Sequence, residues 1–289
     1  MKQSHQWKLA HRTLTLGGRT LVMGILNATP DSFSDSGQFA DHDRAVARAE
    51  EMLAEGADII DIGGESTRPG GEPVAFEEEL RRVVPVIERL TKTIPNILIS
   101  VDTTKSEVAR AALAAGAEIV NDISALRFDF HLADEAARVG AGLILMHSRG
   151  TPATMHRLPP VADIMTEVTQ SLRRSIRVAG RRGVAHESIA IDPGIGFGKS
   201  FEQNIELLAK LDQLVQEFPD FPVLVGTSRK SFIGRLLNDA PIAERLHGTL
   251  ATVTAAILRG ADIVRVHDVR AAVETARVAD AIKRVTSDK

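Results

Sequence analysis

One segment of the chain has the general form of a loop that binds nucleotide phosphates. Residues 192–200 are DPGIGFGKS, and Gly198, Lys199 and Ser200 match the end of the pattern G-x-x-x-x-G-K-[ST]. The first glycine of that pattern would fall at position 193, which is occupied by Pro193. The pattern therefore fails by one residue, and a nucleoside triphosphatase is a poor interpretation of the segment.

Polar side chains of a different kind follow most of the apolar runs. A carboxylate accepts two parallel N–H donors from the edge of an amino-pyrimidinone ring, and Arg, Lys and His hold phosphate groups. Acceptors and cations together indicate a planar, guanidine-like heterocycle that carries an anionic group. The acceptors are Asp102, Asn121 and Asp192, and the cations are Arg68, Lys230, Arg265 and His267.

Each of these residues has a simpler explanation when it is taken alone. An aspartate at the end of a strand often caps the next helix, and Arg265 with His267 would serve equally as a salt-bridge partner of a neighbouring loop. Thr104–Glu107 has the form of a capping box, which supplies a cap other than Asp102 and favours a functional role for that aspartate. What favours function overall is that all of these residues would meet at one rim.

The elements that would bring them together are marked by a recurring phrase. In each copy a helix ends at a glycine, and Ala and usually an acidic residue lead into a β-branched run, as at the start of a buried parallel strand. Four more apolar runs end at Asn27, Asp102, Asp192 and Gly226. The copies of the phrase lie at 55–64, 115–124 and 259–268, with a weaker one at 139–148.

Helical patterns separate these eight runs, which predicts an α/β fold of the (β/α)8 TIM-barrel type. A doubly wound parallel sheet is the alternative. Residues 7–16 are expected to form a short N-terminal hairpin that closes the bottom of the barrel, and no linker divides residues 1–289, so we predict a single domain. Helices are predicted at 43–55, after the Thr104 capping box, and at 163–182, 202–217 and 244–259.

Composition limits the classes of function. A hydrophobic content of 44% and a charged content of 25% are typical of soluble globular proteins. The net charge of −3 argues against a nucleic-acid partner, and the absence of cysteine excludes disulfides and thiolate metal sites. We find neither a signal-peptide core nor an apolar run long enough to cross a bilayer, so no membrane partner and a cytoplasmic location are expected.

Two polar segments, 27–41 and 63–74, have the Asp, Ser, Pro and Gly content of loops and are expected to lie over the barrel mouth. Asn27, together with Asp31 and Asp35, offers hard oxygen ligands suited to Mg²⁺.

Eight motifs, taken together and in order, resemble those of the dihydropteroate synthases of the folate pathway. The likeness runs over nearly the whole chain, and its specificity comes from the set rather than from any one motif. The motifs are MGILNATPDSFSDSG, IDIGGESTRPGG, SVDTTKSEVA, EIVNDISA, LMHSRGTPATM, IDPGIGFGKSFEQNIELL, GTSRKSFIG and ADIVRVHDV.

The resemblance implies a transferase that condenses 6-hydroxymethyl-7,8-dihydropterin pyrophosphate with p-aminobenzoate, giving 7,8-dihydropteroate and pyrophosphate. It also implies assistance by Mg²⁺, a homodimer, and sulfonamides as competitors. We expect dissociative cleavage of the C–O bond, followed by attack of the arylamine. Asp102 would then stabilise the cation, and Lys230 and Arg265 complete the expected catalytic group.

The site residues also follow from the resemblance. The pterin is expected on Asp102, Asn121, Asp192, Lys230 and Arg265; the pyrophosphate on Asn27, Arg68, Arg265 and His267; and Mg²⁺ on Asn27 and Asp35. The aminobenzoate is expected among Thr67, Pro69, Phe197, Lys230 and Ser231, with Phe33 and Phe39 closing over it. Asp192 and the glycines after it thus serve the pterin and the aminobenzoate, and Lys199 and Ser200 are expected to begin the next helix.

Two alternatives remain at this point. A pterin-dependent methyltransferase would share the barrel but would need no pyrophosphate site, and the loops around NATPDSFSD, STRPGG and SRKSF argue against it. A non-catalytic pterin-binding barrel would not require those loop residues, all of which are present.

Overall fold

The computed structural model describes residues 5–28, 38–66 and 73–287. Eight parallel strands form one sheet in the order β8-β7-β6-β5-β4-β3-β10-β9. A bridge between Ile191 and Val223 joins the two ends of this order, and Ile191 N donates to Pro222 O at 2.9 Å. The sheet is therefore a closed barrel, as predicted. Its strands are β3 (Leu21–Asn27), β4 (Ile59–Gly63), β5 (Ile99–Asp102), β6 (Ile119–Asp122), β7 (Gly142–Met146), β8 (Ile189–Asp192), β9 (Leu224–Val225) and β10 (Ile263–Val266).

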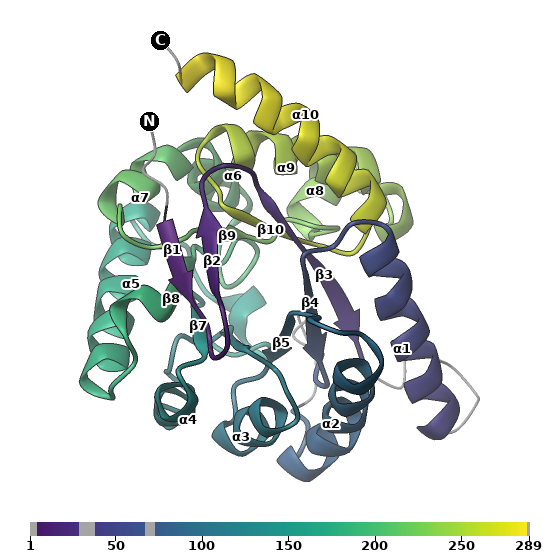
Figure 1. Cartoon of the computed structure of the whole chain (residues 1–289). Coiled ribbons are helices and arrows are strands. Elements are labelled where there is room, and N and C mark those ends of the chain that lie inside the picture. Colours follow the sequence, from purple (N-terminus) through teal and green to yellow (C-terminus); the bar gives the residue numbers. More distant parts are fainter. Residues whose placement is uncertain (1–4, 29–37, 67–72, 288–289) are drawn as a thin grey trace.

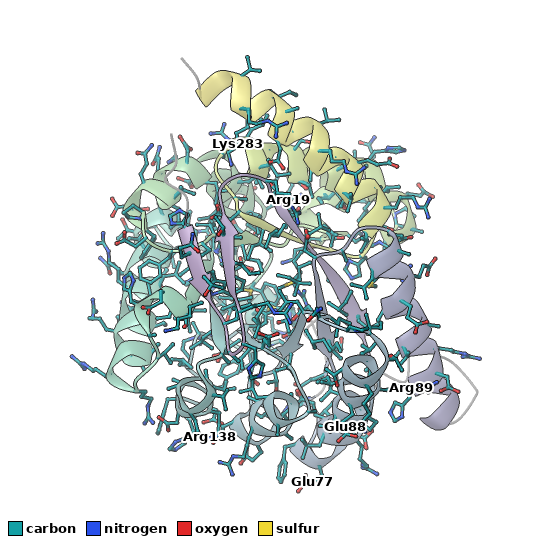
Figure 2. All side chains as sticks on the ribbon, viewed as in Figure 1. Arg19, Glu77, Glu88, Arg89, Arg138 and Lys283 are labelled. Atoms are coloured by element: carbon teal, nitrogen blue, oxygen red, sulfur yellow. The ribbon has the colours of Figure 1, made fainter. Side chains whose placement is uncertain are left out.

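Helices surround the strands and bury their apolar faces against them (Figure 1). Charged side chains such as Glu88, Arg138 and Lys283 project from the outer surface (Figure 2). The helices are α1 (Gln38–Ala54), α2 (Phe76–Thr93), α3 (Ser106–Ala114), α4 (Leu132–Val139), α5 (Ile164–Arg181), α6 (Phe201–Ala209), α7 (Leu211–Glu217), α8 (Ser231–Leu236), α9 (Leu246–Leu258) and α10 (Val269–Ser287). Short 3-10 turns lie at Met155–Arg157, His186–Ser188 and Ile242–Glu244.

The predicted N-terminal hairpin is present and plugs one end of the barrel. Strands β1 (His5–Lys8) and β2 (Thr13–Leu16) pair antiparallel. Trp7 is fully buried, and its indole N–H donates to Ser188 O at 3.0 Å. The hairpin packs on apolar side chains near the start of each barrel strand, among them Met23, Ile59 and Ile119. Because Ser188 directly precedes β8, this plug lies at the N-terminal end of the parallel strands.

Strand alternation then dictates what lies at the other end. Side chains two residues apart in a strand point to the same face. Ile59, Ile119 and Ile263 contact the plug from inside the barrel, so Asp61, Asn121 and Arg265 also point inward, one step nearer the C-terminal rim. By the same rule, Ser100 and Asp102 point inward because Leu98 does, and Asp192 points inward because Ala190 does. The polar strand-end residues predicted from the sequence therefore lie in the interior of the barrel.

Several local predictions were wrong. The capping box at Thr104 does not form: α3 begins at Ser106, whose N–H donates to the Asp129 carboxylate at 2.7 Å. The cap comes from a residue 23 positions later in the chain, which a local pattern cannot show. Asp102 does not cap α3 either, because its carboxylate pairs with Arg265 instead.

Other helix limits also differ from expectation. The helix predicted at 202–217 is two helices, because Lys210 leaves helical geometry with φ −109° and ψ 20°. The helix predicted at 244–259 begins at Leu246, after a 3-10 turn. The segment expected to be a loop as far as residue 41 becomes helical at Gln38, where α1 begins. The helix after the DPGIGFGKS segment starts at Phe201, and Ser200 is its N-cap.

Candidate active site

A layer of charged side chains crosses the barrel interior just above the apolar plug. Arg265 donates from Nε to Asp61 Oδ2 and from Nη2 to Asp102 Oδ2, both at 2.6 Å. Asn121 donates from Nδ2 to the same Asp61 oxygen at 3.1 Å. The structure thus brings together three of the predicted pterin residues, Asp102, Asn121 and Arg265, in one network.

Asp61 is the member of this network that the sequence interpretation missed. Its carboxylate is fully buried, in the middle of the apolar strand β4. One acid interrupts the apolar run IIDIG, but its partner lies far away in the chain and is not visible in the sequence. A charge inside a strand that is buried on both faces needs a partner in the barrel interior, and Arg265 is that partner.

Burial changes the proton affinity of this layer. Desolvation raises the pKa of Asp102 to about 7 in spite of the attraction of Arg265, and the negative charge of Asp61 adds to the effect. Burial likewise raises the pKa of Asp192, against the attraction of Lys230. It lowers the pKa of Lys230 to about 8, opposed by Asp192. Asp102 and Lys230 therefore change charge near neutral pH, as groups at functional sites often do.

The segment after β8 has a different role from that of a phosphate loop. Gly194 has φ +66°, and a Cβ on it would lie 1.8 Å from His147 O, so only glycine fits there. The backbone then carries Phe197 to Lys230, whose Nζ lies 4.3 Å from the ring centroid and donates to Ile195 O. Two predicted aminobenzoate residues, Phe197 and Lys230, are therefore in contact.

Lys199 is a structural residue of this segment. Its buried ammonium donates to three backbone oxygens, those of His147, Gly194 and Phe197, at 3.2, 2.7 and 3.1 Å. Ser200 accepts from Gln203 N, while the Gln203 side chain accepts from Ser200 N, which completes a capping box for α6. The resemblance to a nucleotide loop is thus explained by loop and helix geometry.

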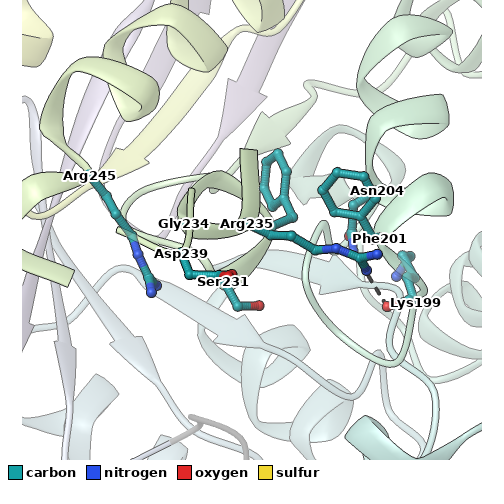
Figure 3. A pocket seen from close by; sticks show the side chains of 9 residues that line it. Lys199, Phe201, Asn204, Ser231, Gly234, Arg235, Asp239 and Arg245 are labelled. Atoms are coloured by element: carbon teal, nitrogen blue, oxygen red, sulfur yellow. Dashed lines mark hydrogen bonds between the residues drawn. The ribbon is translucent and has the colours of Figure 1, made fainter. Parts of the chain in front are cut away.

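A pocket of about 410 Å³ lies beside this segment, between α6 and α8 (Figure 3). Ser231, the third described aminobenzoate candidate, lines it. Arg235 reaches from α8 toward α6, with its guanidinium 4.3 Å from the centre of the Phe201 ring. Ser231, which follows Lys230 in the chain, therefore lies on a pocket that Arg235 and Arg245 also line.

The pyrophosphate candidates are only partly described. Asn27 ends β3 and is half-buried. His267 follows β10, and its Nδ1 lies 2.9 Å from Ser228 Oγ, a hydroxyl that also accepts from His267 N. The remaining candidates, Phe33, Asp35, Thr67, Arg68 and Pro69, and the side chain of Phe39, lie outside the described residues.

Comparisons with known proteins agree with this architecture. Residues 23–267 match the family of pterin binding enzymes. A dihydropteroate synthase from Synechocystis sp. is 51% identical over 268 residues, covering 93% of this chain and 92% of the relative. The crystal structure of a Clostridium difficile dihydropteroate synthase with pteroic acid is 47% identical, with a TM-score of 0.86 over 92% of this chain and 98% of the other. A Yersinia pestis dihydropteroate synthase, solved with a sulfonamide drug, is 43% identical, with a TM-score of 0.88 over 96% and 99%.

The barrel, its buried polar layer and the family match define the class, that of pterin-binding barrel enzymes. Within that class, the chain belongs to the dihydropteroate synthase family. It is a transferase that condenses 6-hydroxymethyl-7,8-dihydropterin pyrophosphate with p-aminobenzoate to give 7,8-dihydropteroate and pyrophosphate. The methyltransferase and the non-catalytic barrel are not favoured, because the likeness to synthases spans nearly the whole chain.

Proposed function

We propose that the pterin ring binds in the buried polar layer, on Asp102, Asn121, Asp192 and Lys230, with Arg265 stacked on its face. One observation carries this assignment. Asp102 Oδ1 is a buried acceptor that finds no partner among the described residues. Buried acceptors without donors are costly, and the amino and ring N–H groups of a dihydropterin are donors of the required kind.

The aminobenzoate is assigned to Phe197, Lys230 and Ser231, joined by Thr67 and Pro69, which lie outside the described residues. Its ring would rest against Phe197, and its carboxylate would point to the pocket that Ser231 and Arg235 line. Sulfonamides carry the same para-amino arene with an acidic group in place of the carboxylate, so we expect them to compete for this place.

The pyrophosphate is assigned to Asn27, Arg68, Arg265 and His267. Mg²⁺ is assigned to Asn27 and Asp35, with Asp35 outside the described residues. No cluster of three or more His, Cys, Asp or Glu residues suited to a metal exists in the described part of the chain. Asn27 and Asp35 supply one amide oxygen and one carboxylate. These donors fit Mg²⁺, which commonly takes one or two protein oxygens and completes its shell with water and substrate phosphate. When bound, Mg²⁺ would offset charge on the leaving pyrophosphate.

The proposed mechanism is dissociative. The methylene C–O bond breaks, both electrons leave with the pyrophosphate, and a cation remains that is delocalised into the dihydropterin ring. Asp102 in its ionised form stabilises that cation across the low-dielectric barrel interior. The arylamine nitrogen then attacks the methylene carbon and loses its extra proton. The chain thus supplies positioning and electrostatics, and no strong base is required because an arylamine is neutral at pH 7.

Two broader features belong to the same proposal. No helix in the described ranges is both long and apolar enough to cross a membrane, and we place the enzyme in the cytoplasm. We also propose a homodimer formed by the late helices. Exposed apolar side chains there support it: Leu258 of α9, and Val278, Ile282 and Val285, which share one face of α10.

Pyrophosphate release from the dihydropterin substrate, with Mg²⁺ and with or without p-aminobenzoate, tests the mechanism. We expect release coupled to dihydropteroate when aminobenzoate is present, and slower release without it as water captures the cation. A strict requirement for aminobenzoate before any pyrophosphate leaves would favour concerted displacement over the dissociative route.

A further inference from the structure

We propose that Asp61 is a positioning residue, which holds Asn121 and Arg265 in the orientations that bind the pterin. The inference rests on the assignment of those two residues to the pterin under Proposed function. It adds a fully buried carboxylate that would not itself contact the reacting atoms.

Asp61 connects strands that are not neighbours. In the barrel order, β6 and β10 each lie two strands from β4, on opposite sides. Asp61 Oδ2 nevertheless accepts from both of them, from Asn121 Nδ2 on β6 at 3.1 Å and from Arg265 Nε on β10 at 2.6 Å. One oxygen atom therefore fixes two proposed pterin contacts across the barrel interior.

The chemistry of a carboxylate sets the orientation of Asn121. A carboxylate only accepts hydrogen bonds, so the amide must turn its NH₂ group toward Asp61. The carbonyl oxygen Oδ1 is then turned away from Asp61 and is able to accept an N–H group from a ligand. With a neutral amide at position 61, either orientation of Asn121 would be satisfied, and the pocket would lose its preference for a donor edge.

Arg265 gains a fixed plane from the same contact. Its guanidinium is held at Nε by Asp61 and at Nη2 by Asp102, so the fork cannot rotate. Asp102 is also a proposed partner of the pterin and of the cation. When substrate draws on Asp102, the bond to Asp61 keeps the guanidinium in place for stacking.

A purely stabilising role for Asp61 fits the layer less well. Buried ion pairs can often be replaced by apolar side chains without loss of stability, and the other oxygen of Asp61 finds no partner among the described residues. Apolar side chains in place of both Asp61 and Arg265 would fill this layer without an ion pair, so stability alone does not require a carboxylate here. A carboxylate at this point is therefore better explained by what it does to Asn121 and Arg265.

The test compares Asp61→Asn with Asp280→Asn. Asp280 is a buried carboxylate that holds Thr20 N and Oγ1, both at 2.8 Å, at the N-terminal end of the barrel. For Asp61→Asn we expect kcat/KM for the pterin substrate to fall about 10- to 100-fold, the scale of one charge-assisted hydrogen bond. The KM for p-aminobenzoate should change little. For Asp280→Asn we expect a lower Tm and unchanged kinetic constants.

A double-mutant cycle separates positioning from general damage. If Asp61 acts through Asn121, adding Asp61→Asn to Asn121→Ala costs less than it does in the wild type. The same cycle with Arg265→Ala tests the second contact. Multiplying effects in both cycles, or a change in Tm without loss of pterin binding, would overturn the inference. Should Asp61→Asn not fold, Asp61→Ser provides the same comparison. If Asn121→Ala and Arg265→Ala themselves leave the Kd for dihydropterin unchanged, the pterin assignment fails first and the inference fails with it.

Discussion

The two ends of the barrel interior are built from the same strands and differ in what they bury. At the N-terminal end, Trp7 and Leu16 of the hairpin pack on apolar side chains with full burial. Nearer the C-terminal rim of the same strands, the carboxylates of Asp61 and Asp102 are buried beside the half-buried Arg265. Two of their oxygens have no partner among the described residues. Packing is complete at one end, and hydrogen bonding is incomplete at the other.

This contrast shows that the N-terminal end of the barrel interior stabilises the fold, whereas the C-terminal end serves function. Apolar burial contributes about 25 cal/mol for each Å² removed from water, whereas a charged layer short of donors reduces stability. Burial of the apolar plug therefore offsets the loss of stability in the polar layer. Substitutions at the two ends should accordingly affect different observables.

The largest expected effect is on the plug. Trp7→Ala removes a fully buried indole and its bond to Ser188 O, and should lower the free energy of unfolding by about 4 kcal/mol. Chemical denaturation measures this directly. Under conditions where the variant stays folded, its KM values should match those of the wild type. A selective rise in the KM for the pterin substrate would show that the two ends are coupled.

The next effect belongs to the polar layer. Asp102→Asn keeps the shape of the side chain but removes the charge proposed to stabilise the cation, so kcat should fall about 100- to 1000-fold. Single-turnover kinetics with both substrates bound isolates the chemical step. Full turnover by this variant would contradict the electrostatic role, whereas a loss of affinity alone would limit Asp102 to binding.

The pH dependence sharpens the comparison without mutation. Burial raises the pKa of Asp102 to about 7 and lowers that of Lys230 to about 8. Below pH 7 Asp102 becomes protonated and cannot stabilise a cation, and above pH 8 Lys230 loses its charge. The kcat/KM for the pterin substrate should form a narrow bell between these values, falling about tenfold for each further pH unit. A flat profile from pH 6 to 9 would exclude both groups as essential ionisations.

Much of this architecture could be predicted from the sequence because it is local. The glycine that ends the helix in each copy of the repeated phrase has φ between 69° and 113°, as a helix C-terminus favours. Strand ends such as Asn27, Asp102 and Asp192 were placed correctly because apolar runs stop there. The rim of a parallel barrel then brings such ends together without any further information.

What the sequence could not show depends on contacts distant along the chain. The cap of α3 comes from Asp129 rather than from Thr104, and the break at Lys210 is not marked by glycine or proline. Asp61 was missed because its role depends on Arg265, 204 residues away. The partners of a buried charge are set by barrel register, which no local pattern records.

The smallest expected effect concerns the segment that imitates a nucleotide loop. Ser200→Ala removes the capping box of α6 and should lower the free energy of unfolding by about 1 kcal/mol. The kinetic constants should stay near those of the wild type, because Lys199 keeps its three carbonyl contacts. Denaturation and steady-state assays on one preparation measure both. A large rise in the KM for p-aminobenzoate would instead show that the start of α6 sets the position of Phe197. Ser200 would then belong to the functional end of the barrel rather than to the scaffold.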